Sequence, residues 1–326
     1  MTHSAAGRFD VITMGRVGVD IYPEQIGVGL EDVTSFAKFL GGSSTNVAVA
    51  ASRLGHRVAT ITRTGDDPFG RFIHTALEGF GVDDRFVSAV PHLPTPVVFC
   101  EIFPPDDFPL YFYREPKAPD LEITPESLDL DAIREAEIFW FTVTGLSQSP
   151  SREAHLAALE ARAETGRTTI IDLDYRPMFW DSEADATEQI TRVLPYATVA
   201  VGNKEECRVA IGEPVQSEMA PEVAAKALHD AGVELAVVKQ GPLGVLGSRG
   251  SEQVVVPPVP VDVVNGLGAG DAFGGSLVHG LLSGFDLERT LTLANAAGSY
   301  VAGQLSCADA MPTVDQLETY LQESGR

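Results

Sequence analysis

Strand-like and helix-like runs of hydrophobic residues alternate along most of the chain. Residues 9–15 (FDVITMG) predict a first strand, 45–55 a helix, and 57–65 a second strand. A helix follows over 68–81, with a proline at its start, where proline is well tolerated. The alternation continues with strands at 137–143, 168–174, 197–203 and 234–241 and helices at 151–166 and 221–232. This pattern predicts an α/β fold in which helices cover a parallel sheet.

Two segments interrupt the alternation and resemble pairs of strands instead. They are residues 20–38 and 95–117, and the second contains a Pro/Asp-rich turn, PPDDFP. We expect them to form a small second sheet that covers the functional site as a lid. The alternative is an additional edge hairpin that takes no part in closure.

Composition and charge narrow the class of protein. The chain has 326 residues, of which 44% are hydrophobic, and its formal net charge is −23. This charge argues against binding to nucleic acid or to an anionic membrane surface, both of which require clustered Lys and Arg. No apolar run approaches the roughly 18 residues of a membrane span. The three cysteines are far apart, so we expect no structural zinc site or disulfide framework, and a soluble protein of the cytoplasm.

Polar and glycine-rich segments follow several of the predicted strands. Ligands of open α/β sheets bind beyond the carboxyl ends of the strands, so these segments should meet at one edge of the sheet. They are Asp20, which follows the first strand, and residues 41–46, 172–176, 202–206, 239–244 and 265–271.

The stretch NGLGAGDAFGG, residues 265–275, combines glycines with an acidic residue before a predicted buried helix. Glycines let a ligand approach the backbone, and amides at a helix start bind anions. Asp271 then has two interpretations: a carboxylate that stabilises the helix dipole, or a base that accepts a hydroxyl proton beside an anion. The dinucleotide fingerprint G-x-G-x-x-G fits poorly, and the chain contains no Gly-Lys pair of a P-loop.

Asn203 and Glu206 lie three residues apart at a strand-to-helix junction. Taken alone, the pair is typical of a helix cap, with Asn at the N-cap and Glu three positions later. The functional alternative is a polar pair that faces phosphates and Mg²⁺.

Taken together, these motifs resemble the ribokinase-like (PfkB) carbohydrate kinases over nearly the whole chain. The resemblance rests on residues 41–70, on the glycine-alanine-glycine-aspartate motif that ends at Asp271, and on N-x-x-E at 203–206. It implies a single kinase domain over 1–326, with a Rossmann-type three-layer α/β/α body and a small β-sheet lid. It also implies transfer of the γ-phosphoryl group of ATP to a sugar hydroxyl.

The resemblance assigns expected roles to individual residues. Asp271 would be the general base, and the amides of Gly268, Ala269 and Gly270 would form the anion hole. The positions expected to hold substrate hydroxyls are Asp20, Gly42 and Asn46.

The nucleotide side follows in the same way. Asn203 would face the nucleotide and Glu206 the Mg²⁺ ion. The remaining residues expected to contact ATP are Lys239, Gly241 and Gly244 near the phosphates and Asn295 near the adenine. By analogy with relatives that pair through their lids, a homodimer is also expected.

One position departs from the family pattern. Many members carry an aspartate six residues before the base, where it helps to arrange a monovalent-cation site, but this chain has Asn265. We therefore expect weak or absent activation by potassium.

Three further stretches, residues 15–27, 112–120 and 172–180, resemble the subfamily that phosphorylates 5-dehydro-2-deoxygluconate in myo-inositol breakdown. That substrate is a sugar acid, whose carboxylate suits the planar fork of a guanidinium group. Arg114, in the expected lid, and Arg176, at a strand end, are the candidate ligands of the carboxylate. Either arginine could instead pair with a local acid such as Glu115 or Asp174.

Other functions stay open at this point. A 2-keto-3-deoxygluconate kinase would share the fold, the chemistry and an acidic substrate. A fructokinase or ribokinase would have a neutral substrate, which gives the two arginines no partner. A sugar-binding regulator without catalysis would be expected to have lost the base or the glycines, and both are intact.

Overall fold

The computed structural model describes residues 8–214 and 219–325, and a ten-stranded sheet runs through the centre of this part of the chain. Its order is β14-β13-β12-β11-β10-β9-β1-β4-β5, with β6 paired to β4 beyond the end of β5. The strands are β1 (Val11–Met14), β4 (Val58–Gly65), β5 (Val82–Asp83), β6 (Val87–Val90), β9 (Ile138–Thr142), β10 (Thr168–Asp172), β11 (Val199–Asn203), β12 (Leu235–Lys239), β13 (Val245–Arg249) and β14 (Glu252–Val256). All pairs from β6 to β12 are parallel, as predicted, whereas β13 and β14 add an antiparallel edge that was not predicted.

Successive residues of the central strands pack into two separate hydrophobic cores. In β1, Val11 belongs to one core and Ile12 to the other; in β9, Ile138 and Trp140 face the first core and Phe139 the second. A strand buried on both faces needs hydrophobic residues at every position. This is why these strands read as continuous apolar runs and not as alternating patterns.

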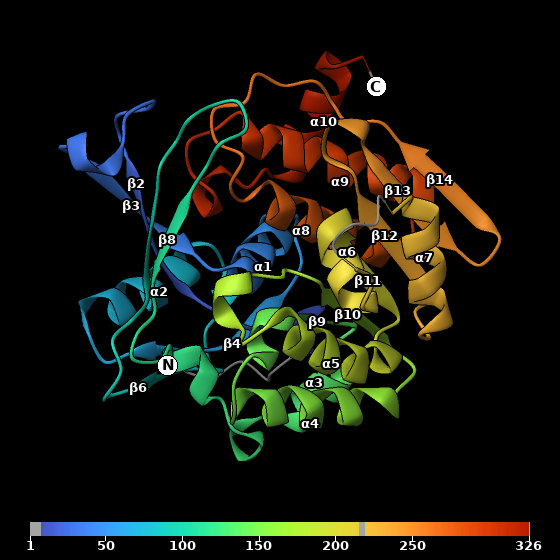
Figure 1. Ribbon diagram of the computed structural model, residues 1–326, viewed down its shortest axis with the longest axis horizontal. Helices are drawn as coiled ribbons and strands as arrows, with labels where there is room; N and C mark the ends of the chain where they lie inside the picture. Colours follow the sequence, from blue (N-terminus) through green and yellow to red (C-terminus); the bar gives the residue numbers. More distant parts are fainter. Residues whose placement is uncertain (1–7, 215–218, 326) are drawn as a thin grey trace.

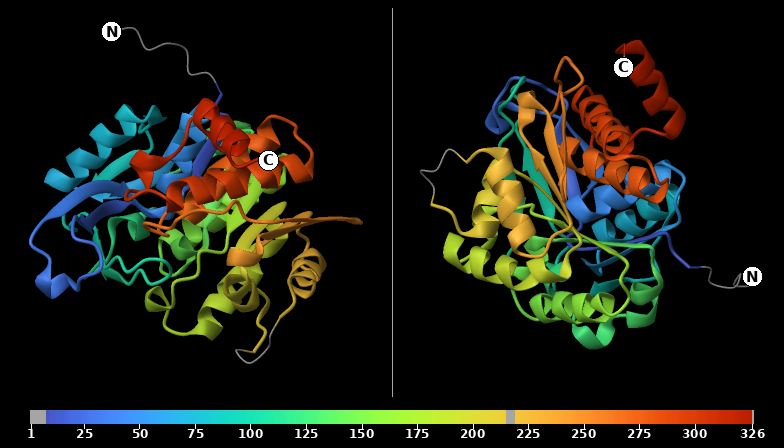
Figure 2. Two further views of the ribbon diagram at one scale, coloured as in Figure 1. Left: turned by 90° about the horizontal axis from the view of Figure 1, so that it is seen from above. Right: turned by 90° about the vertical axis from the view of Figure 1, so that its right-hand side faces the viewer.

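Helices cover both faces of the sheet, which gives the three-layer α/β/α class predicted from the sequence. In the right-hand view of Figure 2 the sheet stands between two groups of helices. The first group is α1 (Ser43–Arg53), α2 (Pro68–Gly79), α8 (Ala269–Leu282), α9 (Leu287–Ala302) and α10 (Val314–Glu323). The second group is α3 (Leu130–Glu135), α4 (Ser151–Ala163), α5 (Glu183–Val193), α6 (Lys204–Ile211) and α7 (Pro221–Asp230). In the residues that the structure describes, no helix has the length and apolar composition to cross a membrane.

The glycines of α8 let this helix lie close to α1. A Cβ atom at Gly275 would come within 2.2 Å of the Cβ of Ala50, and one at Gly274 within 2.6 Å of the Trp140 ring. A side chain at Gly275 would therefore force α8 away from α1, and one at Gly274 would force it away from Trp140 on β9. The close contact fixes the N-termini of α1 and α8, which carry Asn46 and Asp271, relative to each other.

A second, four-stranded sheet lies to one side of the central sheet (Figure 1, left). Its order is β3-β2-β7-β8, with β2 (Gly18–Pro23), β3 (Phe36–Gly41), β7 (Val97–Cys100) and β8 (Leu110–Tyr113). These strands fall in the two segments expected to form a small sheet, extended by two or three residues around the first segment. Strand alternation points Asp20, Tyr22, Val98 and Phe112 toward the central domain, whereas Phe36 and Tyr113 are exposed on the other face.

Candidate active site

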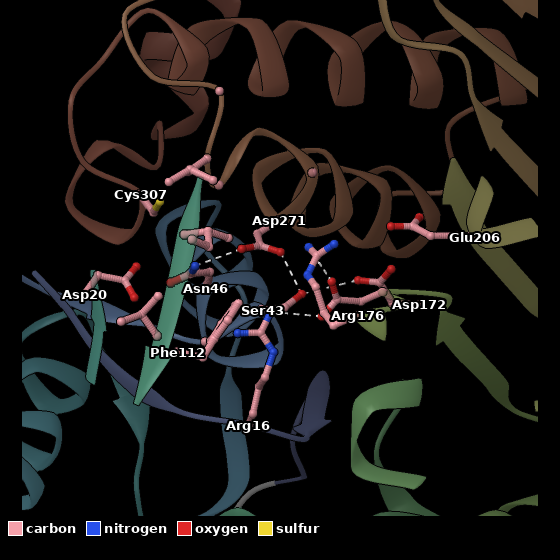
Figure 3. Close-up of a pocket in the computed structure, with 18 of the residues that line it drawn as sticks. Arg16, Asp20, Ser43, Asn46, Phe112, Asp172, Arg176, Glu206, Asp271 and Cys307 are labelled. Carbon is pink, nitrogen blue, oxygen red and sulfur yellow. Dashed lines mark hydrogen bonds and ion pairs between the residues drawn. The ribbon is translucent and has the colours of Figure 1, made fainter. Parts of the chain in front are cut away.

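A cavity of about 170 Å³ lies between the inner face of the small sheet and the carboxyl ends of the central strands (Figure 3). It brings together most of the residues that the sequence proposed from separate segments. Those that line it are Asp20, Gly42, Asn46, Arg176, Glu206, Lys239, Gly268, Gly270 and Asp271. The expectation that these segments meet at one edge of the sheet is therefore confirmed.

Asp271 lies in the first turn of α8 and faces the start of α1. Ser43 Oγ donates a hydrogen bond to its Oδ1 over 2.7 Å, and Asn46 Nδ2 donates one to its Oδ2 over 2.8 Å (Figure 3). Burial raises the pKa of Asp271, as does the nearby Asp174, while the bonds from Asn46 and Ser43 act in the opposite direction. A buried carboxylate held at both oxygens still has free lone pairs for a substrate hydroxyl, so the geometry suits a base.

The N-caps of α8 and α1, the two helices that meet at Asp271, both require glycine. Gly268 caps α8 with φ of 79°, and a Cβ there would come within 2.7 Å of the Cys307 side chain. Gly42 caps α1 with φ of 105°, and a Cβ there would lie 2.4 Å from the carbonyl oxygen of Arg16. The first amides of a helix have no partner within the helix, so α8 can offer N–H groups to an anion beside Asp271.

A second cavity, of about 670 Å³, adjoins the first. Lys239 and Gly270 line both cavities, which therefore meet beside Asp271. The walls of the larger cavity are mainly apolar and include Val259, Val261 and Phe273. The residues predicted to contact ATP that line it are Lys239, Gly241, Gly244 and Asn295, together with Ala269 and Gly270 of the anion hole.

Asn295 also has a local structural role. Its Nδ2 donates hydrogen bonds to the carbonyl oxygens of Val256 and Pro257, over 3.1 and 3.2 Å. The side chain therefore anchors the chain that follows β14 along one wall of the larger cavity.

Lys239 ends β12 among several carboxylates. Its Nζ lies 4.0 Å from Glu206 Oε2. Burial opposes the charge of Lys239, but Glu206, Asp172 and Asp271 together raise its pKa, so it stays protonated at neutral pH. Burial likewise raises the pKa of Glu206. A lysine cation thus stands at the junction of the two cavities, close to the start of α8.

Asn203 and Glu206 form the helix cap that their spacing indicates. The Asn203 side chain accepts from the Glu206 N–H over 2.9 Å, and the Glu206 carboxylate accepts from the Asn203 N–H over 2.7 Å. Glu206 also lines the smaller cavity, whereas Asn203 lines neither of the two. No group of three or more His, Cys, Asp or Glu residues within 8–214 and 219–325 is arranged to hold a metal ion. Mg²⁺ often takes only one or two protein carboxylates beside phosphate oxygens, and Glu206 fits that mode.

The two candidate arginines lie in different places. Arg176 lines the smaller cavity, where its Nη2 lies 2.6 Å from Asp174 Oδ1. Arg114 does not reach this cavity: its Nη2 contacts both oxygens of Asp120, at 3.1 and 2.8 Å, and its guanidinium packs on the Phe179 ring. It lines a separate cavity of about 230 Å³. The structure therefore does not place Arg114 where it could bind a substrate together with Arg176.

The pocket also contains residues that the sequence analysis did not single out. Arg16 follows β1 after one intervening residue, Gly15, at the edge where Asp20 was recognised, so the same rule of strand ends could have found it. Tyr22 hydrogen-bonds to Asp20 Oδ2 over 2.8 Å and to Cys307 Sγ over 2.9 Å. Burial raises the pKa of Asp20 to about 6, which the Tyr22 bond partly offsets. Ser43, Asp172 and Asp174 also line the cavity and fall in the strand-end segments 41–46 and 172–176. Asp174 is the local acid considered above for Arg176, and the two side chains do pair.

The fold and this site define a phosphotransferase that acts on an alcohol group of a carbohydrate. Residues 9–314 match the family described as pfkB family carbohydrate kinase, and the chain belongs to this family. The chain is 32% identical to 5-dehydro-2-deoxygluconokinase of Shouchella clausii, over 97% of this chain and 96% of that protein. It is also 32% identical to the enzyme of the same name from Geobacillus thermodenitrificans, over 96% and 93% of the two chains.

Solved structures agree on the fold. Aminoimidazole riboside kinase from Salmonella enterica, solved with aminoimidazole riboside and an ATP analogue, is 28% identical with a TM-score of 0.82, over 95% of this chain and 99% of that one. A protein of Escherichia coli described as a putative ribokinase II, in complex with ATP and Mg²⁺, is 23% identical with a TM-score of 0.86, over 97% and 99%. The chain therefore has the ribokinase-like fold, with its small accessory sheet.

Proposed function

We propose that the protein transfers the γ-phosphoryl group of ATP to the terminal 6-hydroxyl of 5-dehydro-2-deoxygluconate, in myo-inositol breakdown. The observation that carries this proposal is the position of Asp271, held by Ser43 and Asn46 where two cavities adjoin. One cavity is small and polar, and the other is large and mainly apolar, which suits a sugar acid and a nucleotide respectively. The names of the relatives at 32% identity support the choice of substrate.

In this mechanism the sugar acid lies in the smaller cavity, with Asp20, Gly42 and Asn46 near its hydroxyls. Asp271 accepts the proton of the 6-hydroxyl as that oxygen attacks the γ-phosphorus. The bond between the γ-phosphorus and the β,γ-bridging oxygen breaks, and ADP leaves. Positioning and charge stabilisation are the main tasks of a protein in phosphoryl transfer.

Two sets of groups stabilise the negative charge of the transferred phosphoryl group. The amides of Gly268, Ala269 and Gly270 face it from the start of α8, and Lys239 faces it from the end of β12. When bound, Mg²⁺ supplies positive charge to the phosphates, and Glu206 would hold it directly or through a water molecule. Gly241, Gly244 and Asn295 line the space for the nucleotide, and Asn203 acts through its cap on Glu206.

The small sheet acts as a lid in this proposal. Its inner face supplies Asp20, Tyr22 and Phe112 to the cavity, so closure would exclude water from the sugar. Its outer face exposes Phe36 and Tyr113, which pack edge-on against opposite sides of Phe99. We propose that two copies of the chain pair through this aromatic face, and sedimentation of the F36D/Y113D variant should then give a monomer where the unchanged protein gives a dimer.

The function is tested by coupled measurement of ADP release with ATP, Mg²⁺ and a panel of sugars. The panel contains 5-dehydro-2-deoxygluconate, 2-keto-3-deoxygluconate, fructose and ribose. We expect the highest kcat/KM with the first compound and a product phosphorylated on the 6-hydroxyl. A higher kcat/KM with 2-keto-3-deoxygluconate would reassign the enzyme to that substrate, and a preference for a neutral sugar would reject the sugar-acid proposal.

A further inference from the structure

Two arginines in the smaller cavity share a single carboxylate. Arg16 Nη2 lies 3.0 Å from Asp174 Oδ2, and Arg176 Nη2 lies 2.6 Å from Asp174 Oδ1. Arg16 comes from the end of β1, whereas Asp174 and Arg176 follow β10, and β9 separates these strands in the sheet. The fold thus joins two guanidinium groups from distant segments on opposite oxygens of one acid.

The hydrogen-bonding capacity of these arginines is only partly used. The Arg16 side chain is 11% exposed, and its Nε is a buried atom without a protein partner. The Nε of Arg176 is likewise buried and unpartnered. A guanidinium group carries five N–H donors. Because Arg16 and Arg176 share one carboxylate, several of their donors remain free. One positive charge also remains in excess over the single carboxylate that the two arginines contact.

The two arginines line the smaller cavity but not the larger one. Lys239 and Gly270 line both cavities and mark their junction, whereas Arg16 and Arg176 line only the smaller cavity. The ring of Phe112, on the lid strand β8, lies 5.8 Å from the centre of the Arg16 guanidinium. Phe112 also packs edge-on against Phe179, with ring centroids 5.0 Å apart. The lid therefore covers the cationic end of the sugar cavity with aromatic side chains.

The other charges of the cavity leave few places for an anion. Asp20, Asp172, Glu206 and Asp271 line the same cavity, and burial raises the pKa of each. Asp174 differs: burial opposes its ionisation, but Arg176 and Arg16 more than compensate and lower its pKa. Among the carboxylates that line this cavity, Asp174 is thus the one whose pKa is lowered, and it is the one that both arginines contact.

We propose that Arg16 is a specificity-determining residue, which binds the carboxylate of the sugar acid together with Arg176, in the place first assigned to Arg114. This inference rests on the proposed function, because it concerns the same substrate. A carboxylate in this position would accept N–H groups that have no protein partner and would neutralise the excess charge. A neutral sugar would leave the guanidinium groups without that partner, so the site selects against it.

The test compares two substrates of nearly the same shape, 5-dehydro-2-deoxygluconate and its primary amide, which lacks the negative charge and carries an NH2 donor in place of one carboxylate oxygen. In the unchanged enzyme we expect kcat/KM to be much higher for the acid. R16M should lower kcat/KM for the acid on the order of 100-fold, mostly through KM, because the bound carboxylate loses a charged partner. Arg16 also lowers the pKa of Asp271, so the same variant should reduce kcat/KM for the amide as well, but far less than for the acid, and it should leave the KM for ATP unchanged. R16K, which keeps the charge but not the fork, should recover part of the loss.

R63M is the matched control. Arg63 is a buried arginine outside the three cavities described above, bonded to Thr62, Phe86 and Ser127. R63M removes these bonds and should lower Tm, but it should preserve the ratio of kcat/KM for acid and amide. Circular dichroism and thermal melting show whether each variant is folded. If R16M does not fold, the ratio of kcat/KM for acid and amide in R16K tests the inference.

The outcomes separate the inference from the function on which it rests. If the unchanged enzyme prefers the acid and R16M or R16K reduces that preference, the inference is supported. If the unchanged enzyme prefers the acid but the Arg16 variants lose equally on both substrates, or retain the preference, Arg16 is not the carboxylate ligand while the function stands. If the unchanged enzyme shows no preference for the acid, the proposed function and the inference fail together.

Discussion

Replacement of Asp271 by asparagine tests the proposed base with little disturbance of the site. The two hydrogen bonds of Asp271 can both survive: the new Oδ1 can accept from Asn46, and the new Nδ2 can donate to the Ser43 hydroxyl, which can reverse its role. What is lost is the ability to take a proton. General-base catalysis typically contributes about 10²–10⁴-fold, or about 3–5 kcal/mol at about 1.36 kcal/mol for each tenfold change. We expect kcat to fall by this factor.

The stability of D271N separates loss of the base from loss of the fold. The pKa of Asp271 is raised on folding, so the folded state binds this proton more tightly than the unfolded state does. Ionisation therefore costs stability as pH rises above the ordinary pKa of aspartate, and this cost persists at neutral pH. Asparagine removes it, so Tm at neutral pH should stay the same or rise.

The assay is steady-state turnover across pH, with D286N as a control. Asp286 caps α9 through its bond to the Arg289 N–H, and asparagine preserves such a cap. D286N should keep full turnover, because Asp286 lines neither the sugar nor the nucleotide cavity. In the unchanged enzyme, kcat/KM should decline toward acidic pH as Asp271 is protonated, and D271N should lack that decline. A loss of kcat below tenfold in D271N would refute the assignment.

Three further variations test other parts of the site. E206Q keeps the cap, because glutamine also accepts a hydrogen bond from the Asn203 N–H. We expect this variant to need more Mg²⁺ for half-maximal rate at an unchanged Tm, which would isolate the role of the charge. An unchanged Mg²⁺ requirement would mean that Glu206 serves only as a helix cap. Replacing tetramethylammonium by potassium at constant ionic strength should not stimulate the rate. The buried Asn265 stands where a carboxylate would help to arrange a cation site, and its Nδ2 donates to the Leu305 carbonyl over 2.8 Å. Strong stimulation by potassium would contradict this expectation. R176A should lower kcat/KM for the sugar acid on the order of 30-fold or more and have little effect on the KM for ATP, whereas equal losses on acid and amide would assign it to the fold.

The fold could be predicted because its signals are local. Apolar runs that are buried on both faces mark the parallel strands, and the glycines of 265–275 mark the entry to α8. The antiparallel strands β13 and β14 were missed, although the two-residue turn Gly250–Ser251 between two strand-like runs is a hairpin signal in the sequence. The alternation of Asp20 and Tyr22 toward the cavity likewise depends on the register of β2 with β3 and β7.

The lining of the cavity was predicted best where residues follow or begin elements at one edge of the sheet. Asp271, Asn46 and Glu206 follow or begin elements at one edge of the sheet, and the structure brings all three to the cavity. Arg114 lies outside this cavity, because its guanidinium pairs with Asp120, six residues later, and that pairing was not recognised in the sequence. Arg16 could have been found by its position near a strand end, but its pairing with Asp174, which spans 158 residues, could not. Pairings between distant segments follow from the packing of the sheet and not from local patterns.

The most direct test of the central claim is to identify the product of the unchanged enzyme. Incubation with ATP, Mg²⁺ and 5-dehydro-2-deoxygluconate, followed by ³¹P and ¹³C nuclear magnetic resonance, shows which oxygen carries the new phosphoryl group. The account predicts a phosphate monoester on carbon 6, formed together with an equal amount of ADP. Phosphorylation of another oxygen, or ADP release without a phosphorylated sugar acid, would contradict it.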